Sequence, residues 1–192
     1  MIQSKMVDFF QQAFQLSPEE SIYLNNLISH RKLKKGDFLI KENQVCNEIV
    51  FVKSGILRSF FIDSKEEQVT NCFTFENEFM TAFSSFITQK PTDENIQTIT
   101  DSELEVIDKY AVEELYNSSF RWADIGRKIA ENEVVNLHNR IASLQKNTPT
   151  ERYEALFVNK QKYIQHIPLV YLASYLGIST RHLSRIRQEV LF

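Results

Sequence analysis

The most chemically distinctive stretch of this 192-residue chain lies near its end, where basic, hydroxyl and amide side chains share one helical face. Between residues 179 and 188 the polar face of the helical pattern carries Thr180, Arg181, Ser184, Arg185 and Gln188. Guanidinium groups can form bidentate hydrogen bonds with base edges, and hydroxyl and amide groups can donate to phosphate oxygens. These side chains therefore predict contact with nucleic acid.

Two short helices position that polar face. The apolar positions of the first helix are Leu169, Leu172, Ala173 and Leu176. This helix runs into Gly177, which tolerates a positive φ where the chain turns. The second helix starts after Ser179, a good N-cap residue, and has Leu183 and Ile186 on its apolar face. This order predicts a helix-turn-helix whose second helix enters the DNA major groove. The alternative is an ordinary helical hairpin whose arginines are only solvated.

The net charge of −3 conceals an asymmetry along the chain. Residues 147–192 carry six Lys or Arg against three Glu, whereas residues 1–146 carry 16 basic and 22 acidic groups. A basic end on an acidic body is expected where a DNA-binding module is attached to a domain that does not bind DNA.

Composition and cysteine usage argue against several other classes of protein. The chain is 43% hydrophobic, has no apolar run of membrane-spanning length, and shows no signal peptide in residues 1–20. We therefore expect a cytoplasmic protein without membrane partners. Cys46 and Cys72 lack C-x-x-C spacing, which argues against a zinc site or an iron–sulfur cluster. No cofactor is expected.

Two helical segments at the N-terminus precede short β-branched and aromatic runs. The second segment begins with Ser17-Pro18-Glu19-Glu20, a capping box with proline at the first helical position. Strands are predicted at residues 38–40, 48–53, 56–62, 68–75, 95–100 and 103–108. This spacing is typical of an antiparallel barrel or sandwich. Because the chain has only four glycines, Asn43 and Asn77 are expected to serve some turns.

The long helix predicted after the strands carries a regular apolar stripe. The stripe advances by four and three residues in turn, through Ala130, Val134, Leu137, Ile141 and Leu144. Such spacing is typical of a coiled coil, so Val134, Leu137, Ile141 and Leu144 are predicted to form a homodimer interface. The alternative is a helix packed on its own barrel. Residues 146–150 interrupt the helix and mark a domain boundary.

In this order of elements the chain resembles the Crp/Fnr family of bacterial transcription regulators. The resemblance is carried by residues 33–36, 48–61 and 77–83 and by the helix-turn-helix. It implies a cyclic-nucleotide-binding-type β-barrel, a homodimer formed through the long helix, and binding to a two-fold related site on double-stranded DNA. It also implies RNA polymerase as a partner, and a regulator instead of an enzyme.

The expected fold class is α+β. It comprises an N-terminal antiparallel, jelly-roll-like β-barrel flanked by helices, a long dimerisation helix, and a small α-helical helix-turn-helix domain without an evident wing. The expected domains are a sensor at residues 1–118, the dimerisation helix at 119–147 and the DNA-binding domain at 148–192.

The positions that bind cyclic nucleotide in this family differ here. The resemblance aligns the family's glycine, glutamate, arginine and serine with Thr81, Ala82, Glu94 and Asn95. Ala82 cannot accept a hydrogen bond from a ribose hydroxyl, and Glu94 would repel a phosphate. We therefore predict that cyclic AMP does not bind in the family's usual way. The cysteine set of the family's oxygen sensors is also absent.

A different effector, of unknown identity, could bind within the barrel. The predicted pocket residues mix apolar walls with a few hydroxyl and amide groups, as small-ligand sites do. They are Phe73, Met80, Thr81, Ala82, Phe83, Ser84, Ser85 and Gln97. The alternative is a barrel end that these side chains fill without any ligand.

The resemblance also assigns roles within the helix-turn-helix. Arg185 matches the base-reading arginine, whose fork suits guanine O6 and N7. Thr180 and Arg181 match the other reading positions but differ in type from the best-known members, so a different operator is expected. Candidates for contacts with the DNA backbone are Ser179, Ser184, Gln188 and the pair Lys160 and Lys162, with Arg187 contacting phosphate from the flank of the helix. Without a wing after this helix, fewer phosphate contacts are expected.

Two other classes of function compete with this interpretation. A metal-dependent β-barrel enzyme needs histidines on its strands, and residues 31–108 contain none. The second alternative is a ligand-sensing or protein-interaction module whose helix-turn-helix no longer binds DNA. The capped basic helix argues against it.

Overall fold

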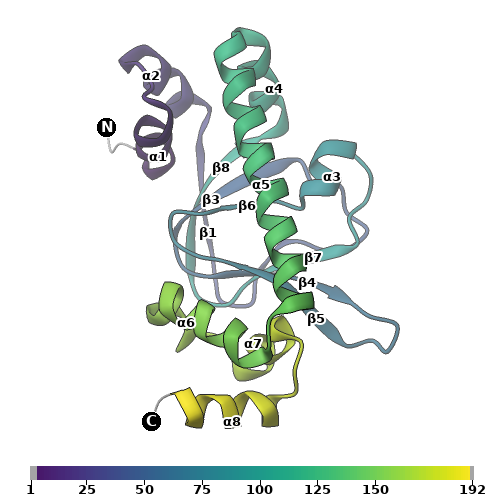
Figure 1. The fold of residues 1–192 in the computed structure, drawn as a ribbon. Helices are drawn as coiled ribbons and strands as arrows, with labels where there is room; N and C mark the ends of the chain where they lie inside the picture. Colours follow the sequence, from purple (N-terminus) through teal and green to yellow (C-terminus); the bar gives the residue numbers. More distant parts are fainter. Residues whose placement is uncertain (1–3, 191–192) are drawn as a thin grey trace. The chain divides into compact units, whose positions relative to one another are not determined.

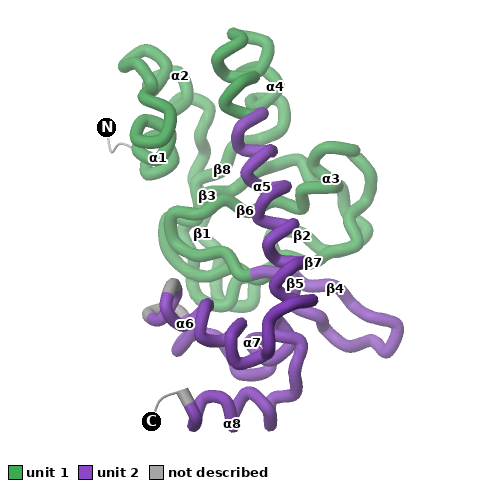
Figure 2. Tube along the Cα trace, in the orientation of Figure 1, with its two compact units in different colours: residues 1–59, 73–126 green, residues 60–72, 127–192 purple. Residues whose placement is uncertain are grey.

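The computed structural model describes residues 4–190, apart from the side chains of residues 159, 162, 163 and 190. The chain divides into two compact units (Figure 2). One unit comprises residues 1–59 and 73–126, and the other comprises residues 60–72 and 127–192. The succession of helices, antiparallel strands, a long helix and C-terminal helices confirms the predicted α+β class (Figure 1).

The first unit begins with two capped helices, α1 (Lys5–Phe14) and α2 (Pro18–Leu27). Ser17 and Glu20 form the predicted capping box at the start of α2. At the start of α1, the buried carboxylate of Glu105 accepts hydrogen bonds from the Ser4 hydroxyl and the Met6 backbone amide, both at 2.7 Å. A carboxylate at a helix N-terminus satisfies free amides and complements the helix dipole, so these bonds attach α1 to the strand that carries Glu105.

The described residues form eight strands in two four-stranded sheets. The strands are β1 (Ser29–Leu33), β2 (Phe38–Ile40), β3 (Glu48–Ser54), β4 (Leu57–Ile62), β5 (Gln68–Thr74), β6 (Phe79–Met80), β7 (Glu94–Thr98) and β8 (Ser102–Asp108). Their orders are β1-β8-β3-β6 and β2-β7-β4-β5. β8 pairs antiparallel with β1 and β3, and β2 pairs antiparallel with β7, which agrees with the antiparallel class that the strand spacing predicts.

Two of these strands were not predicted from the sequence. β1 has mainly polar side chains and no buried residue, so it shows no apolar alternation. β6 is only two residues long. Both pair with longer strands, β1 with β8 and β6 with β3, and this long-range pairing determines their structure.

The turns between strands depend on a few residues with positive φ. Asn43 and Asn77 have φ values of 68° and 66°, which confirms that they serve turns. Gly55 joins β3 to β4 with φ 104°, and a Cβ atom there would lie 2.2 Å from the hydroxyl oxygen of Ser102. A larger residue would clash at this position, so this turn requires glycine.

The remaining elements are helices: α3 (Phe83–Thr88), α4 (Lys109–Ser118), α5 (Phe120–Lys146), α6 (Pro149–Ile164), α7 (Leu169–Leu176) and α8 (Thr180–Val190). Between α5 and α6, Thr148 and Glu151 cap the start of α6 reciprocally. The Thr148 amide donates to the Glu151 carboxylate at 2.7 Å, and the Glu151 amide donates to the Thr148 hydroxyl at 3.3 Å. α6 thus begins as a separate helix with its own cap, which confirms the predicted interruption after α5.

Candidate functional site

Helices α7 and α8 form a small apolar core with a turn between them. Leu172, Leu176 and Leu183 are fully buried, and Ala173 and Ile186 are almost fully buried. Gly177 ends α7 in the left-handed conformation, with φ 69°. The His182 amide donates to the Ser179 hydroxyl at 3.2 Å, so Ser179 caps α8 as predicted. The local geometry is therefore that of a helix-turn-helix.

The predicted DNA-contacting residues of the helix-turn-helix lie on the outer face of α8, with one exception. Ser179, Thr180, Arg181, Ser184, Arg185 and Gln188 are exposed. The hydroxyl of Ser184 donates to the Thr180 carbonyl at 2.9 Å, which leaves its oxygen free to accept. Arg187 is half-buried and its Nε is shielded from solvent. Arg181 and Arg185 are thus the freely presented guanidinium groups of α8.

The apolar stripe of α5 is exposed from Val134 to Leu144, whereas Ala130 at its start is half-buried. The exposed fractions are 64% for Val134, 48% for Leu137, 56% for Ile141 and 45% for Leu144. Trp122 and Ile125, nearer the start of the helix, are buried. The four stripe residues thus lie on one accessible helix face, where a second copy of the chain could pack.

The predicted pocket residues are distributed over four elements and the short segment before α3. Phe73 lies on β5 and Met80 on β6. Thr81 and Ala82 precede α3, Phe83, Ser84 and Ser85 form its start, and Gln97 lies on β7. Met80, Ala82 and Ser85 are buried.

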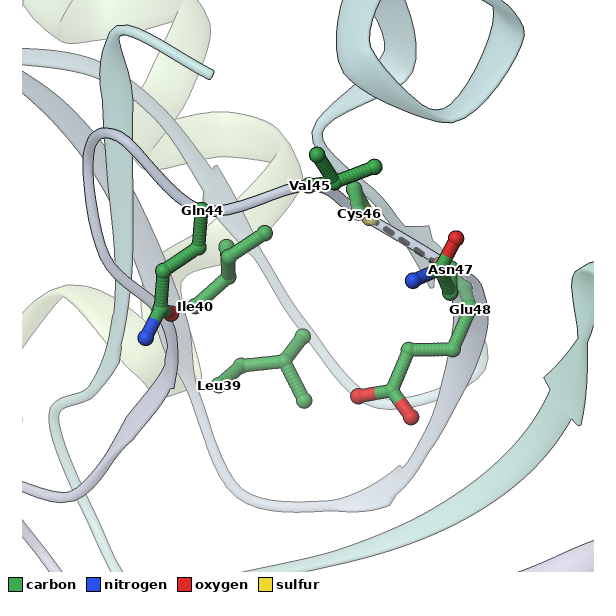
Figure 3. A pocket seen from close by; sticks show the side chains of 7 residues that line it. All are labelled: Leu39, Ile40, Gln44, Val45, Cys46, Asn47 and Glu48. Carbon is green, nitrogen blue, oxygen red and sulfur yellow. Dashed lines mark hydrogen bonds between the residues drawn. The ribbon is translucent and has the colours of Figure 1, made fainter. Parts of the chain in front are cut away.

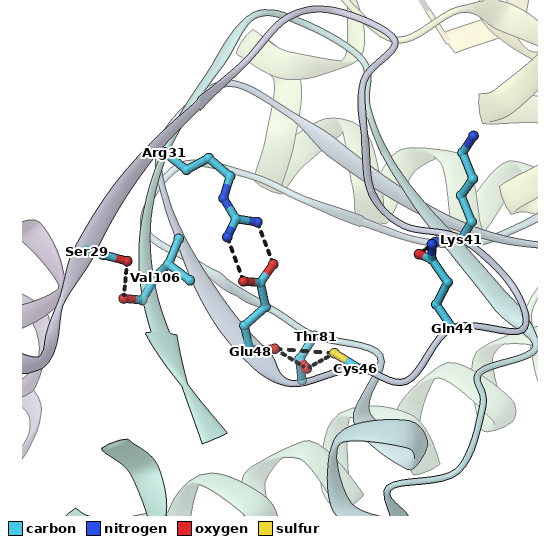
Figure 4. A network of polar contacts seen from close by, with 8 residues as sticks. All are labelled: Ser29, Arg31, Lys41, Gln44, Cys46, Glu48, Thr81 and Val106. Atoms are coloured by element: carbon cyan, nitrogen blue, oxygen red, sulfur yellow. Dashed lines mark hydrogen bonds and ion pairs between the residues drawn. The ribbon is translucent and has the colours of Figure 1, made fainter. Parts of the chain in front are cut away.

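Several polar groups of that set bind to the protein's own backbone. The Thr81 hydroxyl donates to the Glu48 carbonyl at 2.9 Å (Figure 4). The Ser85 hydroxyl accepts from the Cys46 amide at 2.9 Å and donates to the Lys90 carbonyl at 2.5 Å. The Gln97 side chain donates to the Gly36 carbonyl at 2.8 Å. These groups attach α3 and the neighbouring loops to the sheets.

A cavity of about 510 Å³ lies between β2 and the start of β3 (Figure 3). Its lining residues are Leu39, Ile40, Gln44, Val45, Cys46, Asn47 and Glu48. None of them belongs to the predicted pocket set, and no sequence pattern marks them, because a loop and two strand ends bring them together. The cavity combines aliphatic walls with two amides and one carboxylate.

The carboxylate of that cavity is paired with an arginine. Arg31 of β1 donates two hydrogen bonds to the carboxylate oxygens of Glu48, at 2.6 and 2.7 Å (Figure 4). The hydrogen bond with Glu48 raises the pKa of Arg31. Because the guanidinium already neutralises the Glu48 carboxylate and takes one acceptor site on each oxygen, this carboxylate attracts a cationic ligand less strongly than an unpaired one would.

Glu94 occupies the place at which the resemblance expects the phosphate-binding arginine. Its carboxylate accepts a hydrogen bond from the Ser59 hydroxyl. Burial raises the pKa of Glu94, and the neighbouring charge of Asp93 acts in the same direction. The next residue, Asn95, is buried and accepts from the Glu42 amide at 3.2 Å. A partly desolvated carboxyl group at this position opposes a phosphate anion.

In the part of the chain that the structure describes, no group of three or more His, Cys, Asp or Glu side chains is arranged to hold a metal ion. Among the described helices, none has the length and apolar character needed to cross a membrane.

Both the sequence and the structure of this chain are similar to those of known proteins. Residues 30–119 match the model of the cyclic nucleotide-binding domain family. No curated protein sequence matches the chain. Among solved structures, FixK2 from Bradyrhizobium japonicum is similar with a TM-score of 0.74 and 13% identity, over 85% of this chain and 84% of that chain.

Two further structures have a similar fold over most of their length. A transcriptional regulator assigned to the crp/fnr family, from Eubacterium rectale, has a TM-score of 0.71 and 17% identity, over 95% of this chain and 87% of its own. The c-di-GMP responsive global regulator CLP from Xanthomonas campestris has a TM-score of 0.62 and 14% identity, over 88% of this chain and 89% of its own.

The matched segment begins in β1 and ends just after α4, so it contains the cavity, Glu94 and α3. The structural likenesses extend beyond it to the C-terminal helices, because they cover 85% to 95% of the chain. Residues 30–119 therefore match the cyclic nucleotide-binding domain family, and the chain as a whole has the fold seen in these transcriptional regulators.

Proposed function

We propose that this chain is a sequence-specific DNA-binding transcriptional regulator whose recognition helix is α8. The observation that carries the proposal is the exposed face of α8, where Arg181 and Arg185 lie about one turn apart on a helix capped by Ser179. The opposite face, with Leu183 and Ile186, is buried. A guanidinium presented in this way can bind guanine O6 and N7 in the major groove.

The proposed regulator acts as a homodimer on a two-fold related operator. Val134, Leu137, Ile141 and Leu144 supply the dimer interface, because they form an exposed apolar stripe with coiled-coil spacing. A two-fold dimer presents two copies of α8 to half-sites about 34 Å apart along the DNA. In this proposal residues 1–118 are the sensor, 119–147 the dimerisation helix and 148–192 the DNA-binding domain.

The proposed sensor responds to an effector other than cyclic AMP bound in the usual mode, or to no ligand. The support is Glu94, whose partly buried carboxyl group stands where the family's phosphate-binding arginine is expected. The backbone hydrogen bonds of Thr81 and Ser85 favour a barrel end that is filled by its own side chains. By its fold relationship, RNA polymerase is the proposed protein partner.

Selection from a pool of random duplexes, followed by gel-shift titration at rising salt, tests the proposal. The full-length protein is expected to enrich a two-fold related sequence. Its affinity for that sequence should fall steeply as the salt concentration rises, because phosphate contacts release counterions. Enrichment of no sequence would instead support an interaction module whose helix-turn-helix does not bind DNA.

A further inference from the structure

The last turn of α7 is held by residues from outside the helix-turn-helix. The Ser174 hydroxyl accepts a hydrogen bond from the Thr70 amide at 2.9 Å and donates one to the Gln68 carbonyl at 3.2 Å. Residues 60–72, which form the tip of the β4–β5 hairpin, belong to the same compact unit as α7 and α8. This tip is therefore part of the unit that carries the recognition helix.

The two bonds of Ser174 have a simple origin in the sheet. β5 is the last strand in the order β2-β7-β4-β5, so one side of its backbone has no strand partner. On such an edge, the carbonyl of one residue and the amide of the residue two positions later point outward together. A serine hydroxyl both donates and accepts, so Ser174 satisfies Gln68 and Thr70 as a neighbouring strand would.

Two arginines hold the residues that follow Ser174. Arg140 of α5 donates to the Tyr175 carbonyl at 2.5 Å, and its guanidinium lies 3.8 Å from the centre of the Tyr175 ring. Arg152 of α6 donates to the Leu176 carbonyl at 2.7 Å. Carbonyl groups in the last turn of a helix lack helical partners, and cations there complement the helix dipole. Three consecutive residues at the end of α7 are thus fixed by three different segments.

We propose that Ser174 and Arg140 are positioning residues for DNA binding, because they orient α7, and thereby α8, relative to the β4–β5 hairpin and to α5. Only residues 177–179 separate the fixed turn from α8, so its direction transfers to the recognition helix. Arg181 and Arg185 are exposed in this arrangement, as contacts with base edges require. The inference rests on the proposed function and adds that a fixed angle between α5 and α8 determines the half-site spacing.

The test compares Ser174→Thr with Ser174→Val, which have nearly the same shape and differ in the hydroxyl group. Wild-type protein first selects its duplex from a random pool. Affinity is then measured for that duplex and for versions with one base pair inserted or removed between the half-sites. One base pair rotates the half-sites by about 35° relative to each other.

The valine variant loses both hydrogen bonds of Ser174, so it is expected to bind the selected duplex at least about 2- to 10-fold more weakly, the range for the loss of a single hydrogen bond. It should also discriminate less between the altered spacings, because α8 is no longer held at one angle. The threonine variant should retain both wild-type values. A merely stabilising role would lower the melting temperature without changing the spacing preference, so thermal unfolding is recorded for each variant.

Arg140→Lys and Arg140→Met provide a second pair, which keeps the inference testable if the valine variant does not fold. Lysine can still donate to the Tyr175 carbonyl and methionine cannot, so only methionine should relax the spacing preference. If the wild-type protein selects a sequence, but Ser174→Val and Arg140→Met keep the wild-type spacing preference, the inference about positioning is wrong. The proposed function would still stand in that case. Selection of no sequence by the wild-type protein would overturn the proposed function and this inference with it.

Discussion

The outer face of α8 and the barrel end around Thr81 and Ser85 use their polar side chains in different ways. On α8, Arg181 and Arg185 point to solvent and are available to a partner. At the barrel end, Thr81 and Ser85 have hydroxyl groups too, but these bind carbonyls of the protein itself. The guanidinium groups on the exposed face of α8 remain available for recognition, whereas the hydroxyl groups of Thr81 and Ser85 are consumed by backbone carbonyls that need a partner.

The largest expected effect comes from breaking the proposed dimer, on which the function of α8 depends. Ile141→Glu places a charge in the exposed stripe, and the variant is expected to be monomeric in sedimentation experiments. Its affinity for a duplex with two half-sites should fall by about 100-fold or more, because the second contact is no longer intramolecular.

Asn139→Glu is the matched control for this prediction. Asn139 is exposed on the same helix and lies outside the apolar stripe, so its substitution should leave both assembly and affinity unchanged. A dimeric Ile141→Glu protein at micromolar concentration would contradict the assignment of the stripe.

The next effect concerns α8 directly. Arg185→Ala is expected to weaken binding to the selected duplex by roughly 1–3 kcal/mol and to relax specificity at one base pair. Titration against a panel of single-base variants measures both quantities. Lys35→Ala, which removes an exposed cation from a turn of the barrel unit, should leave them unchanged. Equal weakening on every sequence would show that Arg185 contacts phosphate instead of a base.

A smaller effect is expected in the barrel, where Glu94 is desolvated. Its pKa is raised by burial, so the folded state binds more protons than the unfolded state and stability falls as pH rises through that pKa. Glu94→Gln removes this loss, so the variant should gain stability relative to wild type at pH 7.5 but not at pH 4. Urea unfolding at the two pH values measures the difference.

Glu154→Gln, at an exposed position on α6, should show no such pH-dependent gain. The same gain for Glu94→Gln at both pH values would contradict the role of desolvation.

The last prediction is that cyclic AMP does not bind to the barrel, in contrast to the DNA binding expected of α8. Cyclic AMP added to the full-length protein is expected to give no binding heat in calorimetry, because Glu94 and Ala82 do not support the family's phosphate and ribose contacts. Binding at micromolar or lower concentration would show that the barrel accommodates the nucleotide by other groups.

Structural features that depend only on neighbouring residues, such as helix caps and turns, were predictable from the sequence. The capping box of Ser17 and Glu20, the N-cap Ser179 and the turn residue Asn77 each depend on residues within a few positions. β1 escaped prediction because its polar residues become a strand only through pairing with β8.

The candidate sites differ in the same way. The exposed face of α8 follows from helical periodicity, so its residues could be chosen before the structure was known. The cavity beside Glu48 could not be chosen, because residues of β2, a loop and β3 meet there only after the sheets form. The role of Ser174 was equally hidden, since its partners Gln68 and Thr70 lie more than 100 positions earlier in the chain.

The sequence by itself determined the order of elements, the capped basic helix and the apolar stripe, because each is written in the spacing of neighbouring residues. Only the tertiary structure decided which polar groups remain free, where the cavity lies, and which contacts hold α7. Those outcomes depend on long-range hydrogen bonds and burial, which place Ser174 on the edge of β5 and Glu94 in a desolvated position.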